Sequence, residues 1–192
     1  MLELKKLILL ILATNLVYNP AVSADAYSRV VDLSLIPFDK VHLQRNYFNI
    51  NYKYSSVDNN PERISVINKV ILDTTDIVFD FAQKRELSLV RCNHDHFINI
   101  YEINSSDLNN NDIFPRAKYY PNATRIYGIW EPIENNDAIV IAHLDDDALF
   151  EDILSHEIAH YWYNRLNLSK VTSLTHEEFA LLIENKHKRY HK

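Results

Sequence analysis

The amino-acid sequence predicts an α+β fold in which an N-terminal helix packs on a mixed sheet of three to five strands. Two further helices are expected to follow the sheet. Three observations support this prediction. Apolar residues recur at helical spacing over residues 61–84, short β-branched segments come next, and two helical stretches end the chain. The chain has 192 residues, of which 47% are hydrophobic, and this suits a single domain with a real core.

The N-terminus has the pattern of an export signal. Lys5 and Lys6 precede an apolar run, residues 7–13, and the tripeptide Val-Ser-Ala at residues 22–24 offers small residues where a signal peptidase reads them. We therefore expect cleavage after this tripeptide and an exported protein, secreted or periplasmic, whose single domain covers residues 25–192. The apolar run is too short for a comfortable membrane span, so we expect no stable span after the signal is removed.

The first predicted helix follows a mixed segment. Residues 25–59 are rich in Tyr, Asn and Ser, and we expect irregular structure there with one short strand near residues 47–54. Asn60 and Pro61 are typical of a helix start, with Asn as the N-cap and Pro in the first turn. The helix should run to about Lys84. The residues that recur at helical spacing and predict one buried stripe are Ile67, Val70, Ile71, Thr74, Val78 and Phe81.

Segments with the composition of strands come after this helix. Turns rich in Asn and Asp separate them, because a chain with a single glycine, Gly128, must build its turns from other residues. One glycine also excludes Gly-rich phosphate loops and the dinucleotide-binding fingerprint, which need several. The predicted strands are residues 87–92, 97–103, 123–130 and 138–144.

Two helices complete the predicted fold. Aspartates at residues 145–147 favour the N-terminus of the first, residues 147–165, where negative charge is stabilising. A short connection, residues 166–174, leads to the last helix, which begins at Thr175. Thr175 and Glu178 have the spacing of a capping box, in which each side chain satisfies a backbone N–H of the other residue.

The run His156-Glu157-Ile158-Ala159-His160 lies within the predicted helix 147–165. Two histidines four residues apart lie on one helix face, so both imidazoles can reach one zinc ion. Glu157 points toward the same cleft and can take a proton from a metal-bound water. The uncharged flanks and the acidic helix start downstream favour this interpretation over two histidines with ordinary hydrogen bonds. The motif therefore predicts a zinc-dependent hydrolase, in the first place a metallopeptidase.

A third zinc ligand should lie downstream of His160, because catalytic zinc usually has three protein ligands and one open position. If the capping box occupies Glu178, Glu177 is free to face the metal. We expect Glu177 to be the ligand, with Glu178 and His176 as alternatives. The ion would lower the pKa of its bound water toward about 7, and Glu157 would pass the water proton to the leaving amine.

With these residues the chain resembles the zincin metallopeptidases, and among them the gluzincins, whose third ligand is a glutamate. The resemblance covers roughly residues 61–190 as an order of elements, and it implies a zincin-like fold. It also implies that His156, His160 and Glu177 are zinc ligands and that Glu157 is the general base. The residue that stabilises the oxyanion is not identified by the resemblance; candidates, each with a structural alternative, are Tyr163, His176 and Tyr190.

The resemblance further implies that an extended substrate lies along an edge strand ahead of the metal helix. In this chain the matching strand is residues 125–130, where Tyr127, Gly128 and Ile129 would hold a peptide by backbone pairing. One position departs from the pattern. Some gluzincins have an acidic residue four positions after the ligand glutamate, to orient a histidine, and here that residue is Leu181.

These expectations lead to one function and two alternatives. We expect an exported zinc metallopeptidase that cleaves a peptide or protein substrate, with a shallow, open cleft. The alternatives are a catalytically idle zincin-like module that binds or inhibits a partner, and a zinc hydrolase of a non-peptide amide. The net charge of -6, without a basic block before the C-terminus, gives nucleic-acid binding little support.

Overall fold

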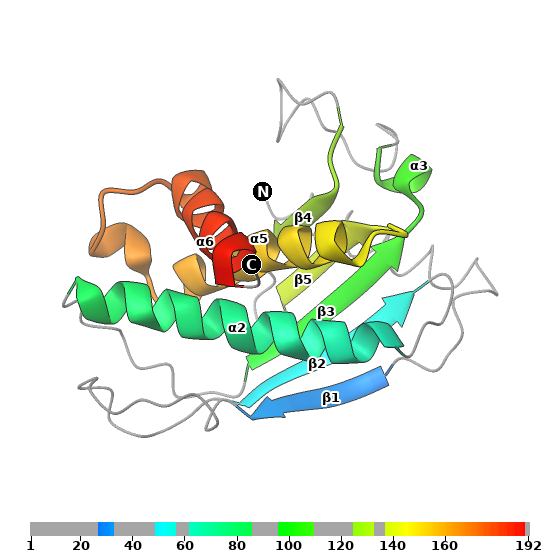
Figure 1. Ribbon diagram of the computed structural model, residues 1–192, viewed down its shortest axis with the longest axis horizontal. Helices are drawn as coiled ribbons and strands as arrows, with labels where there is room; N and C mark the ends of the chain where they lie inside the picture. The colour runs from blue at the N-terminus through cyan, green and yellow to red at the C-terminus, as the bar shows by residue number, and fades with distance from the viewer. Residues whose placement is uncertain are drawn as a thin grey trace.

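The computed structural model describes residues 27–32, 49–56, 62–85, 96–109, 125–132 and 137–190. These residues form an α+β structure in which the long helices α2, α5 and α6 cover one face of a mixed sheet (Figure 1). This agrees with the predicted fold class. The predicted export signal, the predicted strand at residues 87–92 and the predicted helix start at Asn60 and Pro61 lie outside the described residues.

The described strands form one five-stranded sheet in the order β1-β2-β3-β5-β4. The three inner strands are parallel to one another. They are β2 (Asn49–Ser56), β3 (His96–Ile103) and β5 (Asp137–Ala142). The strands at the two edges, β1 (Tyr27–Asp32) and β4 (Gly128–Glu131), are antiparallel to β2 and β5. The sheet is therefore mixed, and among the described strands β4 pairs only with β5.

Alternate side chains of the strands face the helices, as the period of two in a strand requires. One row crosses four strands at the level of the site, because Tyr54 is the register partner of Ile100, Ile100 of Ile139, and Ile139 of Trp130. Tyr54, Ile100 and Ile139 are almost completely buried and belong to the main core. Trp130 packs against the same core, which places the side chain of this β4 residue on the helix side of the sheet.

Helix α2 (Glu62–Lys84) supplies a large part of this core. All six residues of its predicted stripe are buried, so the helical periodicity was interpreted correctly. Polar contacts fix α2 against α5 at its middle: the hydroxyls of Thr74 and Ser155 are 3.0 Å apart, and the Trp162 indole donates to the Thr75 hydroxyl at 2.9 Å. This packing holds the helix that carries the two histidines.

The two helices that follow the sheet have the predicted order. Helix α5 (Asp147–Arg165) begins after Asp146, whose carboxylate accepts from two backbone N–H groups of the first turn. A 3₁₀ turn (Leu168–Lys170) lies in the connection to α6 (His176–Tyr190). Helix α6 packs against α5 through apolar residues that are fully buried, namely Phe179, Ala180 and Ile183.

Three elements differ from the prediction. The segment expected to be irregular contains β1, which is stabilised by pairing with β2 and not by an apolar pattern of its own. A short helix, α3 (Ser105–Leu108), lies in the Asn- and Asp-rich segment at residues 104–112, where a loop was expected. Strand β4 begins at Gly128, later than predicted. The Asn109 side-chain amide forms hydrogen bonds of 2.9 Å with both the backbone N–H and the C=O of Ile126, and so takes the place of a strand partner there.

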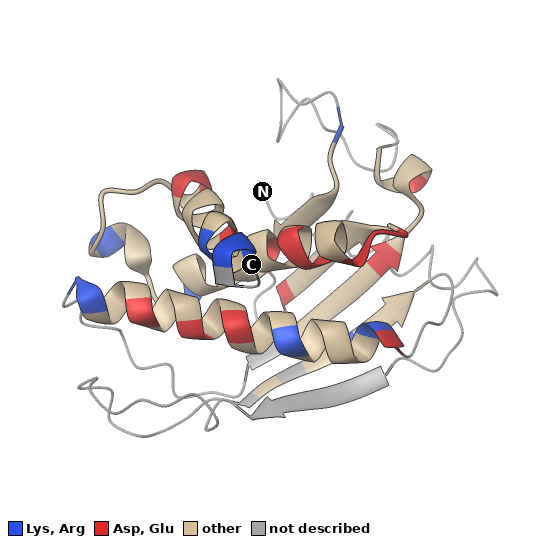
Figure 2. Ribbon diagram, viewed as in Figure 1, with Lys and Arg blue, Asp and Glu red and all other residues tan. Residues whose placement is uncertain are grey.

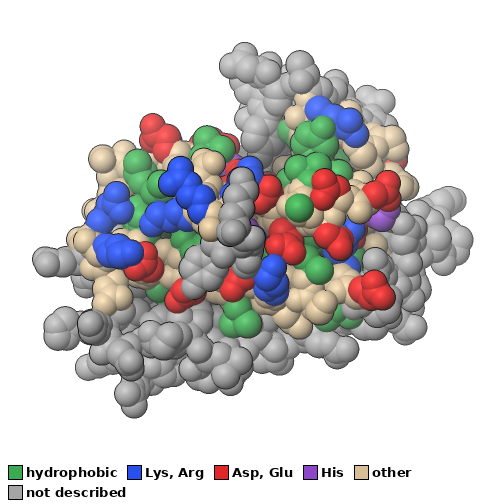
Figure 3. Space-filling view, viewed as in Figure 1, with side chains coloured by type: hydrophobic (Ala, Val, Ile, Leu, Met, Phe, Trp, Pro, Cys, Tyr) green, Lys and Arg blue, Asp and Glu red, His purple; other side chains and the backbone are tan. Residues whose placement is uncertain are grey.

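Charges are unevenly distributed over the face that the helices form. Basic side chains gather over the C-terminal ends of α2 and α6, and acidic ones over the start of α5 and along α2 (Figures 2 and 3). Among the described residues, no helix is both long enough and apolar enough to cross a bilayer.

Candidate metal centre

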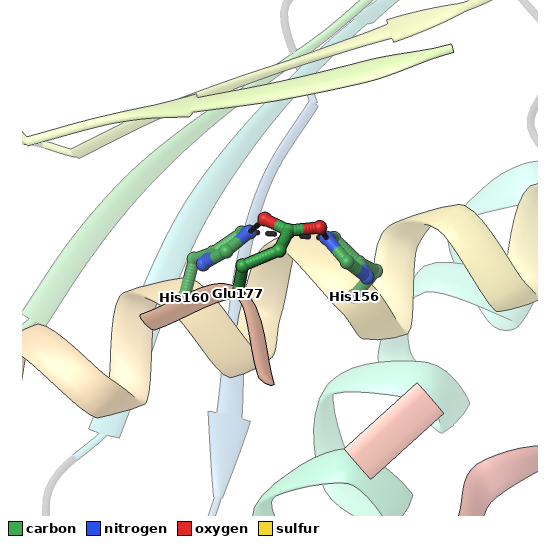
Figure 4. A group of neighbouring side chains, drawn as sticks. All are labelled: His156, His160 and Glu177. Atoms are coloured by element: carbon green, nitrogen blue, oxygen red, sulfur yellow. Dashed lines mark hydrogen bonds and ion pairs between the residues drawn. The ribbon is translucent and has the colours of Figure 1, made fainter. Parts of the chain in front are cut away.

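Helices α5 and α6 bring the three predicted metal ligands together. His156 and His160 project from the same side of α5, and the Glu177 carboxylate enters from the first turn of α6 and lies between the two imidazoles (Figure 4). The two Nε2 atoms are 3.0 Å apart, and each is 3.4 Å from one oxygen of Glu177. The geometry thus brings the two histidines together with a glutamate that lies 17 positions after the second of them.

These three residues form a group that could hold a metal ion, because their ligand atoms all lie within 4.8 Å of one another. In a tetrahedral zinc site with bonds of about 2.0–2.1 Å, ligand atoms are about 3.3 Å apart, which is close to the spacing seen here. Two imidazole nitrogens and one carboxylate are also a donor set that catalytic zinc uses. The residues present therefore fit a zinc ion, and no other such group occurs in the described part of the chain.

The predicted capping box is present, and it occupies Glu178 while Glu177 lies beside the histidines. The Glu178 carboxylate accepts from the Thr175 backbone N–H and from the Thr175 hydroxyl, both at 2.8 Å, and the Glu178 N–H donates back to that hydroxyl. These bonds direct Glu178 away from the histidines. The hydrogen bond from His160 lowers the pKa of Glu177, so this residue is a carboxylate and suited to hold a cation.

Protonation states of the two histidines differ for physical reasons. Burial lowers the pKa of His160, which keeps its ring neutral, as a metal ligand must be. Burial also acts to lower the pKa of His156, but the hydrogen bond to Glu184 and the surrounding carboxylates outweigh it and raise that pKa. The bond joins Nδ1 of His156 to Glu184 Oε2 at 2.9 Å, and it leaves Nε2 of His156 directed at the candidate metal position.

The side chain of Glu157 projects from α5 toward the edge strand β4, and the residue is 4% exposed. Burial raises the pKa of its carboxyl group to about 7, although the protonated form of His156 and a backbone hydrogen bond from Trp130 oppose this shift. Oxygen Oε2 of Glu157 is buried and has no hydrogen-bond partner. Glu157 is therefore a buried acid–base group with one free acceptor, and it is not part of the metal-ligand group.

Gly128 makes room for Glu157. A Cβ atom at Gly128 would lie 2.5 Å from Glu157 Oε1 and 2.7 Å from Ile153 Cγ2, closer than real Cβ contacts. Its φ angle is not positive, so the glycine is required here by close approach and not by backbone conformation. Of the three predicted substrate residues, Gly128 is thus the one that the structure places against the base.

Backbone groups of β4 alternate between β5 and the opposite edge. The Tyr127 carbonyl accepts from the Ala142 N–H at 2.8 Å, so Tyr127 faces β5, and by the alternation of antiparallel pairs Ile129 does as well. The backbone groups of Gly128 and Trp130 face the other edge. Trp130 lies in the predicted substrate strand, residues 125–130, but was not one of the three residues named in it; the pairing register places its backbone groups at the free edge.

The predicted oxyanion candidates have structural partners. The His176 ring donates from Nε2 to the His160 carbonyl at 3.1 Å, and the Tyr163 hydroxyl donates to the Leu174 carbonyl at 2.7 Å. His176 also packs against the rings of His160, Trp130 and Tyr163. These residues hold His160 and the start of α6 in place. The side chain of Tyr190 lies outside the described residues.

No protein-family model, curated protein or solved structure matches this chain. The interpretation of the site therefore depends on its geometry and chemistry. Membership of the gluzincins stays a prediction based on the sequence.

Proposed function

We propose that this protein is a zinc-dependent hydrolase that cleaves peptide bonds, with Glu157 as its general base. The observation that carries the proposal is the convergence of His156, His160 and Glu177 beside a buried carboxylate with a pKa near neutrality. A general base is most effective when its pKa lies near the pH at which it works. A purely structural cluster of ion pairs would not explain why a buried carboxyl group lies next to three potential metal ligands.

The ligand set suits zinc better than harder cations. Mg²⁺ and Ca²⁺ prefer oxygen ligands, whereas two imidazoles with one carboxylate are typical of catalytic zinc with an open position. When bound, Zn²⁺ supplies Lewis acidity, which lowers the pKa of water and polarises a carbonyl group. His156, His160 and Glu177 would hold the ion. The exposed side of Glu177, whose side chain is 57% exposed, leaves an approach for a substrate.

Glu157 moves the proton in the proposed reaction. Its carboxylate takes a proton from the attacking water and gives it to the leaving nitrogen. The Trp130 N–H and the close packing of Gly128 fix one side of the carboxylate, and the unpartnered Oε2 is the atom available to the water. Burial keeps other water from competing for this proton.

The edge of β4 supports a peptide as substrate. An extended peptide can pair with outward-facing N–H and C=O groups of an edge strand. The backbone N–H and C=O of Gly128 both face this edge. At Trp130 the N–H donates to Glu157, so only its C=O is left to pair with a peptide. A peptide bond held there would lie next to the base. The N-terminal signal pattern adds the proposal that the substrate is met outside the cytoplasm.

The test compares zinc content with turnover in the mature chain. We expect one zinc per chain by elemental analysis and cleavage of a random peptide library, followed by mass spectrometry. His160→Ala should lose the zinc. Glu157→Gln should keep the zinc and lose at least a hundredfold in rate, because general-base catalysis contributes about 10²–10⁴-fold.

A matched control removes a carboxylate from the same helix without touching the site. Glu151 pairs with Lys69 near the surface, so Glu151→Gln should keep both zinc and activity. Full activity of Glu157→Gln would refute its role as base. Stoichiometric zinc without cleavage of any peptide would favour the idle binding module, and cleavage of other amides alone would favour the non-peptide hydrolase.

A further inference from the structure

Glu184 is the acidic residue that contacts a ligand histidine in this fold. It lies seven residues, or two helical turns, after Glu177 on α6, so both carboxylates project toward α5 from the same helix face. Glu177 contacts His156 at Nε2 and Glu184 contacts the same ring at Nδ1. The residue four positions after Glu177, Leu181, is 45% exposed and takes no part.

Lys188 holds Glu184 in this position. Its ammonium group forms ion pairs with Glu184 on its own helix and with Asp152 on α5, the latter at 3.5 Å. Asp152 lies one turn before His156 on α5. The four side chains therefore form a ladder of charges between the helices, in the order Asp152, Lys188, Glu184 and His156.

The ladder is separate from the apolar contacts that dock α6. Phe179, Ala180 and Ile183 are fully buried against the core, whereas Glu184 and Lys188 lie at the rim with side chains 18% and 38% exposed. The pair between Lys188 and Asp152, whose side chains are 38% and 24% exposed, adds little to stability. The position of the ladder is thus better explained by its effect on the His156 ring than by a need to attach the helix.

We propose that Glu184 is a positioning residue that fixes the tautomer and orientation of His156, and that Lys188 keeps the Glu184 carboxylate in place. An acceptor at Nδ1 holds the ring proton there and leaves Nε2 unprotonated for a cation. The negative charge also makes the ring a stronger donor to the cation. This inference rests on the proposed zinc site and assigns a role to residues outside its ligand set.

The first measurement uses the metal-free protein and reads the ring itself. The ¹⁵N chemical shifts of the His156 imidazole report which nitrogen carries the proton. At a pH high enough to keep the His156 ring neutral, we expect the proton on Nδ1 in the wild type and in Glu184→Gln, whose amide oxygen can still accept. In Glu184→Ala this preference should be lost. A contact that is merely structural would not move this signal.

The second measurement is zinc affinity by competition with a chromophoric chelator. Glu184→Ala should bind zinc about 10–100-fold more weakly, the usual cost of losing such a partner, and Glu184→Gln, which keeps the acceptor but loses the charge, should weaken binding by less. Lys188→Met should weaken zinc binding by a smaller factor, because Glu184 keeps its charge but loses its anchor. The control Asp80→Asn removes one carboxylate from a surface pair on α2 and should leave the affinity unchanged.

The outcomes separate the two proposals. Wild-type zinc binding with unchanged affinity in both Glu184 variants would overturn the positioning role and leave the proposed function standing. Zinc binding that is absent in the wild type, or indifferent to His156→Ala, would overturn the function and the positioning role with it. Should Glu184→Ala fail to fold, Glu184→Gln has nearly the same shape and still decides the affinity test.

Discussion

Replacing Gly128 with alanine should separate the base from the metal ligands. Gly128 is the only glycine of the chain, and β4 passes over Glu157 at this residue. The added Cβ would lie 2.5 Å from Glu157 Oε1, 2.7 Å from Ile153 Cγ2 and 3.0 Å from Glu157 Cγ. None of these atoms belongs to His156, His160 or Glu177, so the substitution is aimed at the position of the base.

The expected size of the effect follows from these distances. Relaxed contacts are about 3.5 Å, so the Glu157 carboxylate or the β4 backbone must shift by about 1 Å. A misplacement of about 1 Å can cost about a hundredfold in rate. Overpacking of this kind costs about 1–3 kcal/mol of unfolding free energy. We therefore expect kcat/KM to fall about a hundredfold, while zinc stoichiometry stays at the wild-type value.

The assay combines peptide cleavage, zinc content and denaturant unfolding of the same preparations. Ile153→Ala provides the matched control, because it removes one of the two clashing side chains. In that background Gly128→Ala should cost less stability than in the wild type, yet activity should stay low since the clash with Glu157 remains. Wild-type kcat/KM in the folded Gly128→Ala variant would refute the idea that β4 seats the base.

Two further predictions concern charge. Zinc should raise the thermal midpoint of the wild type and of Glu178→Gln but not of Glu177→Ala, because a ligand stabilises only the state that binds it. Calorimetry measures these shifts, and equal shifts in the two variants would contradict the assignment of Glu177 as the ligand. The second prediction is a loss of stability in alkali. Burial and the hydrogen bond to Glu102 raise the pKa of Tyr54 above that of an unfolded tyrosine, which is about 10. The neutral phenol therefore contributes stability fully below pH 10 and loses it as the pH rises further, because the unfolded chain then ionises first. Denaturant unfolding from pH 8 to 11.5 should show this loss in the wild type, and Tyr54→Phe should flatten it; parallel curves would exclude Tyr54 as its source.

Local signals in the sequence were enough to predict the three long helices and the group of candidate ligands. The aspartates before α5, the four-residue spacing of His156 and His160, and the capping box at Thr175 all act within one or two turns of helix. The capping box was informative beyond the helix start, because it assigned Glu178 to the backbone and left Glu177 for the site. These features need no knowledge of how the helices pack.

Features that depend on packing could not be predicted in this way. The start of β4 depends on the Asn109 side chain, which comes from a segment 17 residues earlier and pairs with Ile126. The role of Glu184 depends on how α6 lies across α5, since only the docked helix brings it to His156. A spacing of seven between two glutamates is a weak signal, because many surface helices contain it.

The charges of the site explain why one helix, α6, carries both the proposed ligand Glu177 and the proposed positioning residue Glu184. The site gathers the carboxylates of Glu157, Glu177 and Glu184, and the negative charges of the last two add to the burial that raises the pKa of Glu157. Lys188 offsets part of this charge from the rim, and it reaches Glu184 but forms no ion pair with Glu177 among the described residues. A divalent cation between Glu177 and the two histidines would compensate the remainder where it is greatest. Docking of α6 therefore brings acidic side chains to the position where His156, His160 and Glu177 meet, and this supports the proposed cation site.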